Sequence, residues 1–167
     1  MAPSNNDSDP IACRNGRGET VIVKRCELQF RPSAYVVIEA SGLVLVMRSK
    51  TGKYFFPGGG QDKGELLQHC AARETREETG GLEVTIGKYL GVFEDFYYWQ
   101  RENIAYHTQC HAYVAHLVDR SAVLPEGFGD DQEGYPEWKP LAELSEHPEM
   151  MMRGIADRIL QSYLESR

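Results

Sequence analysis

The sequence predicts a layered domain of β-strands and α-helices, of the α/β or α+β class. Two observations lead to this prediction: apolar, β-branched segments occur in the first third of the chain and again in the middle, and each group is followed by a segment rich in helix formers. A length of 167 residues suits one domain. A chain of this size buries roughly 70% of its unfolded surface, so it needs no disulfide or metal to fold.

The first part of the chain is predicted to hold a flexible tail followed by strands. Residues 1–17 are polar and contain Pro3, Pro10 and Gly16, so we expect them to be flexible and the domain to span residues 18–167. The next apolar runs predict strands at residues 20–30, 34–40 and 43–49.

A glycine-rich run and a helix come next. Residues 54–60 read YFFPGGG, and residues 65–79 contain helix formers throughout, ending before Gly80. Two further strands are predicted at residues 82–96 and 103–118. Apolar residues at helical spacing predict a closing helix at 148–164.

Composition excludes several classes of function. The chain has 25 acidic and 18 basic residues, a net charge of −7, which argues against a protein that coats nucleic acid. Its four cysteines form no CxxC pair, as expected for reduced thiols in the cytoplasm. No apolar run is long enough for a membrane span and the N-terminus does not resemble a signal peptide, so we expect a soluble protein without membrane contacts.

Three glutamates of the predicted helix fall on its apolar side. A projection at 100° per residue puts Glu74, Glu77 and Glu78 on one side. The apolar residues on that same side are Leu66, Leu67, Cys70 and Ala71. Three inward carboxylates would repel one another unless they were neutralised. Oxygen ligands favour Mg²⁺ or Mn²⁺ over zinc. Structural ion pairing with Arg73 and Arg76 is the open alternative.

The loop before the helix is suited to close contact with a ligand. Gly58, Gly59, Gly60 and Gly64 have no side chains that would intrude, so backbone groups there can approach an ion. A backbone carbonyl of this loop could complete a metal shell.

The spacing of these residues resembles the Nudix box of the Nudix hydrolases. Gly59 is followed after five residues by Glu65, and after seven more by the run RETREETG that starts at Arg73. The resemblance implies an α/β/α sandwich around a mixed β-sheet. It also implies hydrolysis of a pyrophosphate bond in a nucleoside diphosphate linked to another moiety, such as a nucleoside triphosphate or a dinucleoside polyphosphate. Thr75 and Gly81 depart from the pattern, which usually has large aliphatic residues there, and Leu82 is expected to supply the missing apolar contact.

The resemblance also assigns roles to individual residues. It implies that the metal ligands are Glu74, Glu77, Glu78 and the carbonyl of Gly58, with Glu77 and Glu78 at the centre of catalysis. Arg73 matches the arginine that orients these carboxylates. Glu65 occupies an acidic position expected to support the loop. The implied cofactor is Mg²⁺, with Mn²⁺ as an alternative, and the implied partner is a small nucleotide substrate.

A general base outside the box is expected in the segment QEGYPEW, residues 132–138. This segment resembles the acidic loop of MutT-type enzymes, which makes Glu133 the first candidate and Glu137 the second. The alternative for either residue is an ordinary solvent-facing loop acid, because acidic residues crowd this segment.

Two pairs of residues are candidates for substrate binding. Arg48 and Lys50 precede the glycine loop and could contact phosphates. Tyr97 and Tyr98 lie 16 and 17 positions past Gly81, where the family's diadenosine-polyphosphate hydrolases carry a tyrosine, and could stack on a base. Ordinary packing of these aromatic side chains is the alternative.

Two other functions remain open at this point. One is a Nudix-fold module that binds or senses a nucleotide without cleaving it, although the three intact glutamates favour an enzyme. The other is RNA-end processing, for which the sequence offers no broad basic surface. Family members are often dimers, so the resemblance leaves a homodimer open.

Overall fold

A computed structural model describes residues 6–129 and 134–167. Within this range the chain forms two compact units. The first comprises residues 6–31 and 94–109, and the second comprises residues 32–93, 110–129 and 134–167. The elements, in chain order, are β1 (Pro10–Asn15), β2 (Thr20–Lys24), the 3₁₀ turn η1 (Arg25–Glu27), β3 (Leu28–Ala40), β4 (Leu43–Arg48), β5 (Tyr54–Phe55), β6 (Gly58–Gly60), α1 (Leu67–Glu78), β7 (Val84–Trp99), β8 (Ile104–Leu117), β9 (Tyr135–Pro140), α2 (Leu141–Glu146), the 3₁₀ turn η2 (Pro148–Met150) and α3 (Ala156–Glu165).

The first unit contains a hairpin that the sequence did not reveal. β1 pairs antiparallel with β2 and parallel with the end of β7. The prediction of a flexible tail over residues 1–17 is therefore wrong for Pro10–Asn15. The Asn15 side chain accepts hydrogen bonds from the amides of Arg17 and Glu19, both at 2.9 Å, so residues typical of a loop form the turn of the hairpin.

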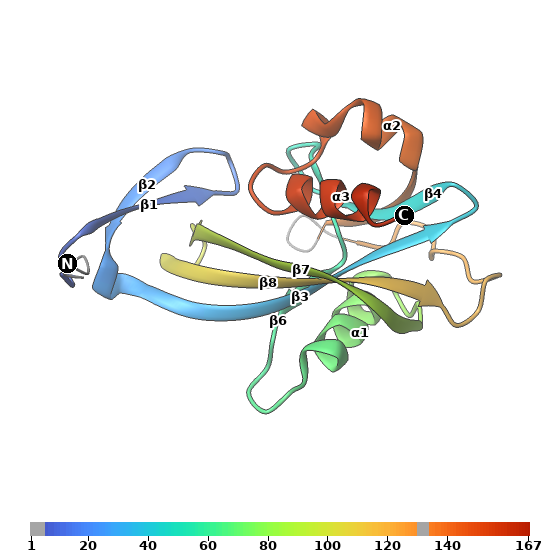
Figure 1. Cartoon of the computed structure of the whole chain (residues 1–167), viewed down its shortest axis with the longest axis horizontal. Helices are drawn as coiled ribbons and strands as arrows, with labels where there is room; N and C mark the ends of the chain where they lie inside the picture. The colour runs from blue at the N-terminus through green and yellow to red at the C-terminus, as the bar shows by residue number, and fades with distance from the viewer. Residues whose placement is uncertain (1–5, 130–133) are drawn as a thin grey trace. The chain divides into compact units, whose positions relative to one another are not determined.

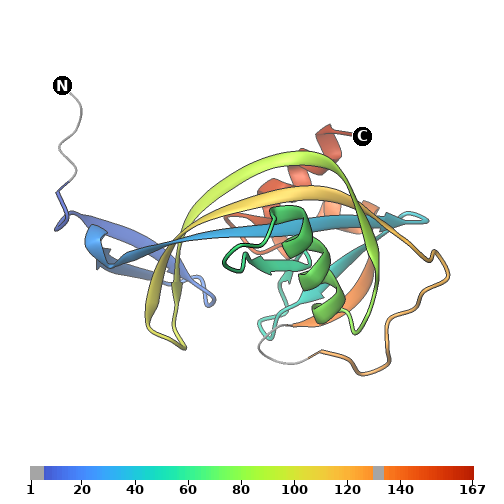
Figure 2. The ribbon, with the colours of Figure 1, turned by 90° about the horizontal axis from the view of Figure 1, so that it is seen from below.

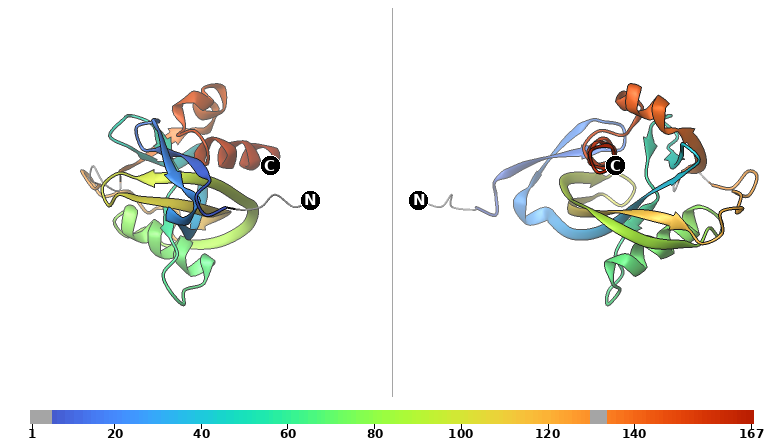
Figure 3. Two further views of the ribbon diagram at one scale, coloured as in Figure 1. Left: turned by 90° about the vertical axis from the view of Figure 1, so that its left-hand side faces the viewer. Right: turned by 45° about the vertical axis from the view of Figure 1, so that its right-hand side comes forward.

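The second unit is built on one sheet with helices on both faces. Its strands follow the order β7-β8-β3-β4-β5, with β6 also paired to β3 and β9 also paired to β4. α1 lies on one face, and α2 and α3 lie on the other (Figure 1). The same three layers of this unit can be followed in the view from below (Figure 2) and in two further orientations (Figure 3). The predicted α/β/α sandwich around a mixed sheet is confirmed.

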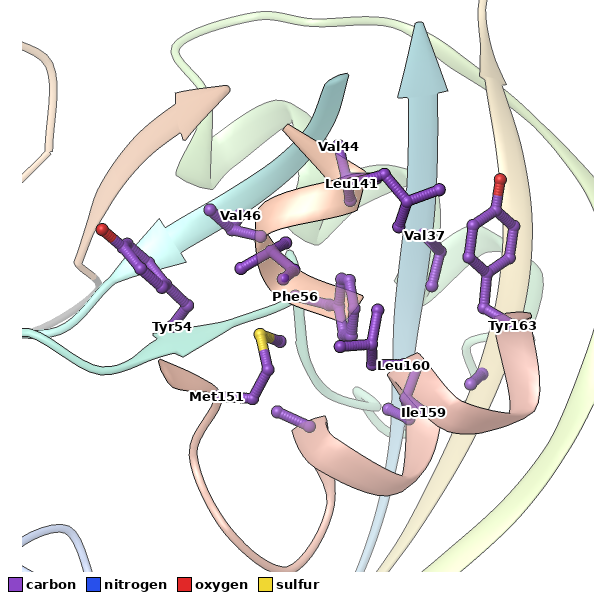
Figure 4. Close-up of a cluster of buried hydrophobic side chains, with 13 residues drawn as sticks. Val37, Val44, Val46, Tyr54, Phe56, Leu141, Met151, Ile159, Leu160 and Tyr163 are labelled. Carbon is purple, nitrogen blue, oxygen red and sulfur yellow. The ribbon is translucent and has the colours of Figure 1, made fainter. Parts of the chain in front are cut away.

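Two apolar cores separate these layers. The α1-side core is formed by buried residues of the sheet, of α1 and of the segment that follows α1, namely Ala34, Val36, Ile38, Leu45, Cys70, Ala71, Leu82, Tyr113 and Ala115. The α3-side core contains Val37, Val44, Val46, Tyr54, Phe56, Ala112, Leu141, Leu144, Met151, Ala156, Ile159, Leu160 and Tyr163, most of which are labelled in Figure 4. Neighbouring residues of one strand contribute to opposite cores because side chains alternate across a sheet.

β3 pairs with β6 in its middle and with β4 at its C-terminal end, and this change of partner positions the site. Residues 33–35 of β3 pair with β6, whereas Glu39 and Ala40 pair with β4. β4 pairs along its whole length with β9, a strand that the sequence did not predict. The chain therefore leaves β4, forms β5 beside it, and returns to β3 as β6.

The end of the chain differs from its prediction. The helix expected over residues 148–164 is divided into η2 and α3. Gly154 between them has φ +105°, outside the helical region, and Met151 bridges to Tyr54 instead of continuing a helix. α2 was not predicted. None of the helices in the described part of the chain has the length and apolar content that crossing a membrane requires.

Candidate metal and phosphate site

α1 and the glycine strand β6 place the predicted carboxylates close together. α1 begins after Leu66, which is largely exposed although the helical projection put it on the apolar side. At the other end Gly80 has φ +70°, and the amide of Gly81 donates to the Arg76 carbonyl at 2.8 Å. This left-handed glycine explains why the helix stops where the sequence predicted.

Arg73 is the centre of a dense network, which we call the Arg73 centre. Its Nε and Nη2 each donate to one oxygen of Glu65 at 2.9 Å, so the pair is bidentate. Nη1 donates to Glu74 at 2.9 Å and to Glu77 at 3.1 Å. Nη2 also donates to the Gly60 carbonyl at 3.1 Å. One guanidinium thus connects the loop, β6 and two of the three predicted carboxylates.

The charges of this network are strongly coupled. Hydrogen bonds from Arg73 lower the pKa of Glu65 to about 2, and the same contacts raise the pKa of Arg73 above its ordinary value. Glu65 also accepts a hydrogen bond from the Asp62 amide at 3.1 Å. These contacts confirm the expectation that Glu65 supports the loop.

Glu78 is fixed by the backbone of β6. Its side chain is buried, and one carboxylate oxygen accepts a hydrogen bond from the Gly58 amide at 2.8 Å. Gly58 has φ +146°, and a Cβ there would lie 2.2 Å from the Ala34 carbonyl oxygen. Only glycine can therefore bring this amide against Glu78.

Glu74 lies against Gly59. A Cβ at Gly59 would lie 2.6–2.7 Å from the carboxyl atoms of Glu74, so the missing side chain makes room for that carboxylate. The Cys70 thiol donates to the Gly59 carbonyl at 3.5 Å. Burial, with Glu65 and Glu74 nearby, raises the pKa of Cys70 to about 12, so the thiol stays protonated. The sequence offered one clue to this contact, because Cys70 lies one helical turn before Arg73 and Glu74.

The donor set fits a hard divalent cation. Glu74, Glu77 and Glu78 supply carboxylate oxygens, and the two glycines form a cradle that a Cβ would fill. Within residues 6–129 and 134–167, no three His, Cys, Asp or Glu side chains already converge as the ligands of a metal ion do. The fit therefore rests on the chemistry of the donors and on the glycine cradle.

The open alternative of ion pairing is realised in part. Arg73 pairs with Glu74 and Glu77, as an arginine that orients these carboxylates should. Arg76 turns away and comes within 4.0 Å of Glu83. The Glu77 side chain remains about half exposed, so it can face a ligand from solvent.

The two departures from the family pattern are accommodated by packing. Thr75 is fully buried, and its hydroxyl donates to the Ala71 carbonyl at 2.7 Å, which satisfies the polar group within the helix. Gly81 is exposed, whereas Leu82 is buried in the α1-side core. The expectation that Leu82 supplies the missing apolar contact is confirmed.

Arg48 and Glu137 meet across β4 and β9, and we call them the Arg48 pair. Nε of Arg48 lies 3.5 Å from Oε1 of Glu137, and the guanidinium stands 5.1 Å from the centre of the Tyr135 ring. Glu137 is opposite Val46, so it faces the α3-side core, whereas α1 packs against the other face. Lys50 is exposed, in the turn between β4 and β5.

The remaining predicted site residues are not brought to α1 by any described contact. Tyr97 and Tyr98 belong to the first unit, where Tyr97 packs against Trp99 at a centroid distance of 6.0 Å and Tyr98 donates to Asn103. Glu133 lies outside the described residues, so its role stays a prediction.

Comparison with known proteins agrees with this geometry. The model of the NUDIX domain family matches residues 29–162. Comparison with curated proteins finds no match.

Solved structures share the fold at low sequence identity. A NUDIX hydrolase from Nitrosomonas europaea is 18% identical with a TM-score of 0.60, and the match covers 83% of this chain and 90% of that one. A MutT protein from Methanosarcina mazei Go1 is 21% identical with a TM-score of 0.59, and the match covers 84% of this chain and 98% of that one. An ADP-ribose pyrophosphatase from Streptococcus suis is 14% identical with a TM-score of 0.58, and the match covers 81% of this chain and 90% of that one.

Proposed function

This chain belongs to the NUDIX domain family and is a Nudix hydrolase, an enzyme that hydrolyses pyrophosphate bonds in nucleoside diphosphate derivatives, and we propose that its substrates are small nucleotides. We propose further that the reaction requires Mg²⁺ or Mn²⁺. The substrate class that we propose is a nucleoside triphosphate or a dinucleoside polyphosphate.

One observation carries this proposal. Two glutamates of α1 reach the backbone of β6, Glu78 by a hydrogen bond to the Gly58 amide and Glu74 by close contact with Gly59. Arg73 holds Glu74 and Glu77 from the side. A site that concentrates carboxylates beside a glycine strand is suited to a divalent cation that is also coordinated by phosphate oxygens of a substrate.

The protein's own contribution is to hold these groups in place. We assign Glu74, Glu77, Glu78 and the Gly58 carbonyl as the groups that would hold the cation. When bound, the cation offsets phosphate charge and lowers the pKa of a water molecule. Arg73 holds two of the carboxylates in place by hydrogen bonds, which reduces the reorganisation required when charge develops on the substrate. Glu65 in turn fixes Arg73.

A base from outside α1 completes the proposal. Glu133 remains our candidate for accepting the proton of the attacking water, on the basis of the resemblance of residues 132–138 to the acidic loop of MutT-type enzymes. Glu137, the second candidate, is opposite Val46 and near Arg48, so its contacts favour a different role.

The test is a screen of purified protein with Mg²⁺ or Mn²⁺ against nucleoside triphosphates, dinucleoside polyphosphates, ADP-ribose and UDP-linked compounds. Release of phosphate, pyrophosphate or nucleoside monophosphate is the readout. We expect turnover of at least one class, abolished by a chelator and restored by the metal. Nucleotide binding without turnover of any of them would instead support a binding module.

A further inference from the structure

In the Arg48 pair, a buried carboxylate oxygen takes part in an ion pair but in no hydrogen bond with the described residues. Glu137 Oε1 is buried and has no hydrogen-bond partner in the described part of the chain. Its distance of 3.5 Å from Arg48 Nε is longer than a good hydrogen bond between these groups. Buried polar atoms without partners are exceptions in native proteins, and each calls for an explanation. A ligand that donates hydrogen bonds to this carboxylate would provide one.

The surroundings of the pair leave a ligand room to approach. The side chains of Arg48 and Glu137 are 43% and 33% exposed, so Arg48 can rotate while Glu137 stays on its strand. Tyr135, opposite Arg48 in the register of β4 and β9, presents its ring to the guanidinium. The Tyr54 hydroxyl points away from the other labelled side chains of the α3-side core (Figure 4). Arg48 thus contacts both a carboxylate and an aromatic ring.

The pair lies within a short length of chain of the glycine strand. Arg48 pairs with Tyr54 in β5, and four residues lead from Tyr54 to Gly58, a span of at most about 14 Å. The Gly58 amide is bound by Glu78. A Cβ at Gly134 would lie 3.1 Å from the Phe55 ring, so β5 and the start of β9 are closely packed. The Arg48 pair and the glycine strand are therefore joined by a short stretch of chain.

The chemistry of the pair selects a base edge. A carboxylate accepts hydrogen bonds and a guanidinium donates them. Guanine presents the acceptor O6 beside two donors, N1–H and the N2 amino group. Adenine and cytosine instead place a ring nitrogen acceptor beside an amino donor, and the acceptor would face the carboxylate. Uracil presents one donor between two carbonyls.

Building on the proposed function, we propose that Arg48 and Glu137 recognise a guanine base of the substrate, with Glu137 accepting from N1–H and N2 and Arg48 donating to O6. The unpartnered Oε1 of Glu137 gains donors in this arrangement. The ribose is not the element recognised, because it is common to all four nucleotides.

Equilibrium binding without metal tests this proposal separately from catalysis. The probes are GMP, IMP and AMP, which share the ribose and phosphate and differ in the base edge. We expect the wild-type chain to bind GMP about 10- to 100-fold more tightly than AMP, with IMP between them because it lacks the N2 amino group. Equal binding of GMP and AMP would overturn the proposal.

Two variants locate the recognition. Glu137→Gln keeps the size of the side chain but replaces a pure acceptor with a mixed donor and acceptor, so the preference for GMP should fall at least about ten-fold. Glu146→Gln makes the same chemical change at an exposed residue of α2 and should keep the preference. An unchanged preference in Glu137→Gln would contradict the proposal. Should that variant fail to fold, Glu137→Asp retains the charge on a shorter side chain, and the proposal requires a weaker GMP preference there too.

The two proposals fail in different ways. A wild-type chain that prefers GMP but hydrolyses no nucleotide would overturn the proposed function and leave guanine recognition standing. A chain that hydrolyses nucleotides with equal kcat/KM for guanine and adenine substrates would support the proposed function and overturn guanine recognition.

Discussion

Arg73 and Arg48 of the second unit both lie beside glutamates, and they differ in how completely their hydrogen bonds are used. In the Arg73 centre, the guanidinium binds both oxygens of Glu65, one oxygen each of Glu74 and Glu77, and the Gly60 carbonyl. In the Arg48 pair, Nε of Arg48 lies 3.5 Å from Oε1 of Glu137, and this buried oxygen has no hydrogen-bond partner among the described residues.

The difference indicates two kinds of task. A guanidinium whose donors are engaged by the protein itself fixes the groups around it and contributes pre-organisation. An incompletely paired group is more easily recruited by a ligand, because binding adds hydrogen bonds that the free protein lacks. We therefore expect changes at the Arg73 centre to affect all substrates and the stability of the fold, and changes at the Arg48 pair to affect the choice of base.

The largest expected effect is on turnover at α1, next to the Arg73 centre. Glu78→Gln retains a carbonyl oxygen for the Gly58 amide, so the fold should persist, but it removes a charged metal ligand. We predict a loss of at least about 100-fold in kcat for every substrate tested. Glu83→Gln, at a side chain that is 67% exposed, is the matched control and should keep its activity. Normal turnover by Glu78→Gln would remove α1 from the proposed site.

Replacing each arginine by lysine compares the two centres directly. Lysine cannot reproduce the bidentate contact with Glu65, so Arg73→Lys should lower kcat by about 10- to 100-fold and the free energy of unfolding by about 3 kcal/mol. Arg48→Lys should cost less than about 1 kcal/mol, because its ion pair is partly exposed. Urea denaturation and steady-state kinetics on the same preparations provide the measurement. Equal losses of stability would abolish the distinction between the centres.

Gly59→Ala tests the close packing beside the Arg73 centre. The new Cβ would meet the end of the Glu74 side chain, which can move, so the fold should survive while the carboxylate is displaced. We predict a loss of about ten-fold in kcat and a higher Mg²⁺ concentration at half-maximal rate. A variant with wild-type metal dependence would show that the position of Glu74 does not matter.

The smallest expected effect concerns pH and stability. In the folded chain the pKa of Glu65 is lowered to about 2 by Arg73, against about 4.3 in an unfolded chain. The ionised pair therefore stabilises the fold above about pH 4.3, and this contribution is lost as the pH falls toward 2. Glu65→Gln should reduce the free energy of unfolding at pH 7, where the ionised pair contributes fully, and flatten its decline in acid. A parallel decline in both proteins would assign the acid sensitivity to other groups.

The site on α1 could be predicted from sequence because its groups are close along the chain. Helix formers followed by Gly80 define α1, and the spacing of Glu74 and Glu78 places both toward the sheet. The partners of Arg73 also lie within one turn or in the preceding loop. Local spacing therefore carries most of this geometry.

Contacts that depend on strand register could not be predicted in this way. β9 contains Pro136 and Pro140, which conceal its alternation, and it becomes a strand through pairing with β4. The Arg48 pair exists because that register sets Glu137 opposite Val46, two positions from Arg48. β1 was missed for a similar reason, since its pairing with β2 and β7 supplies order that its polar sequence does not suggest.

The most direct test of the α1 site is a Mn²⁺ binding titration followed by electron paramagnetic resonance, with the wild-type chain, Glu78→Gln and Glu83→Gln. If α1 and β6 hold the cation, the wild-type chain and Glu83→Gln will bind Mn²⁺ equally, and Glu78→Gln will bind it at least about ten-fold more weakly. Equal affinity in all three proteins would contradict the assignment of the metal site to these carboxylates.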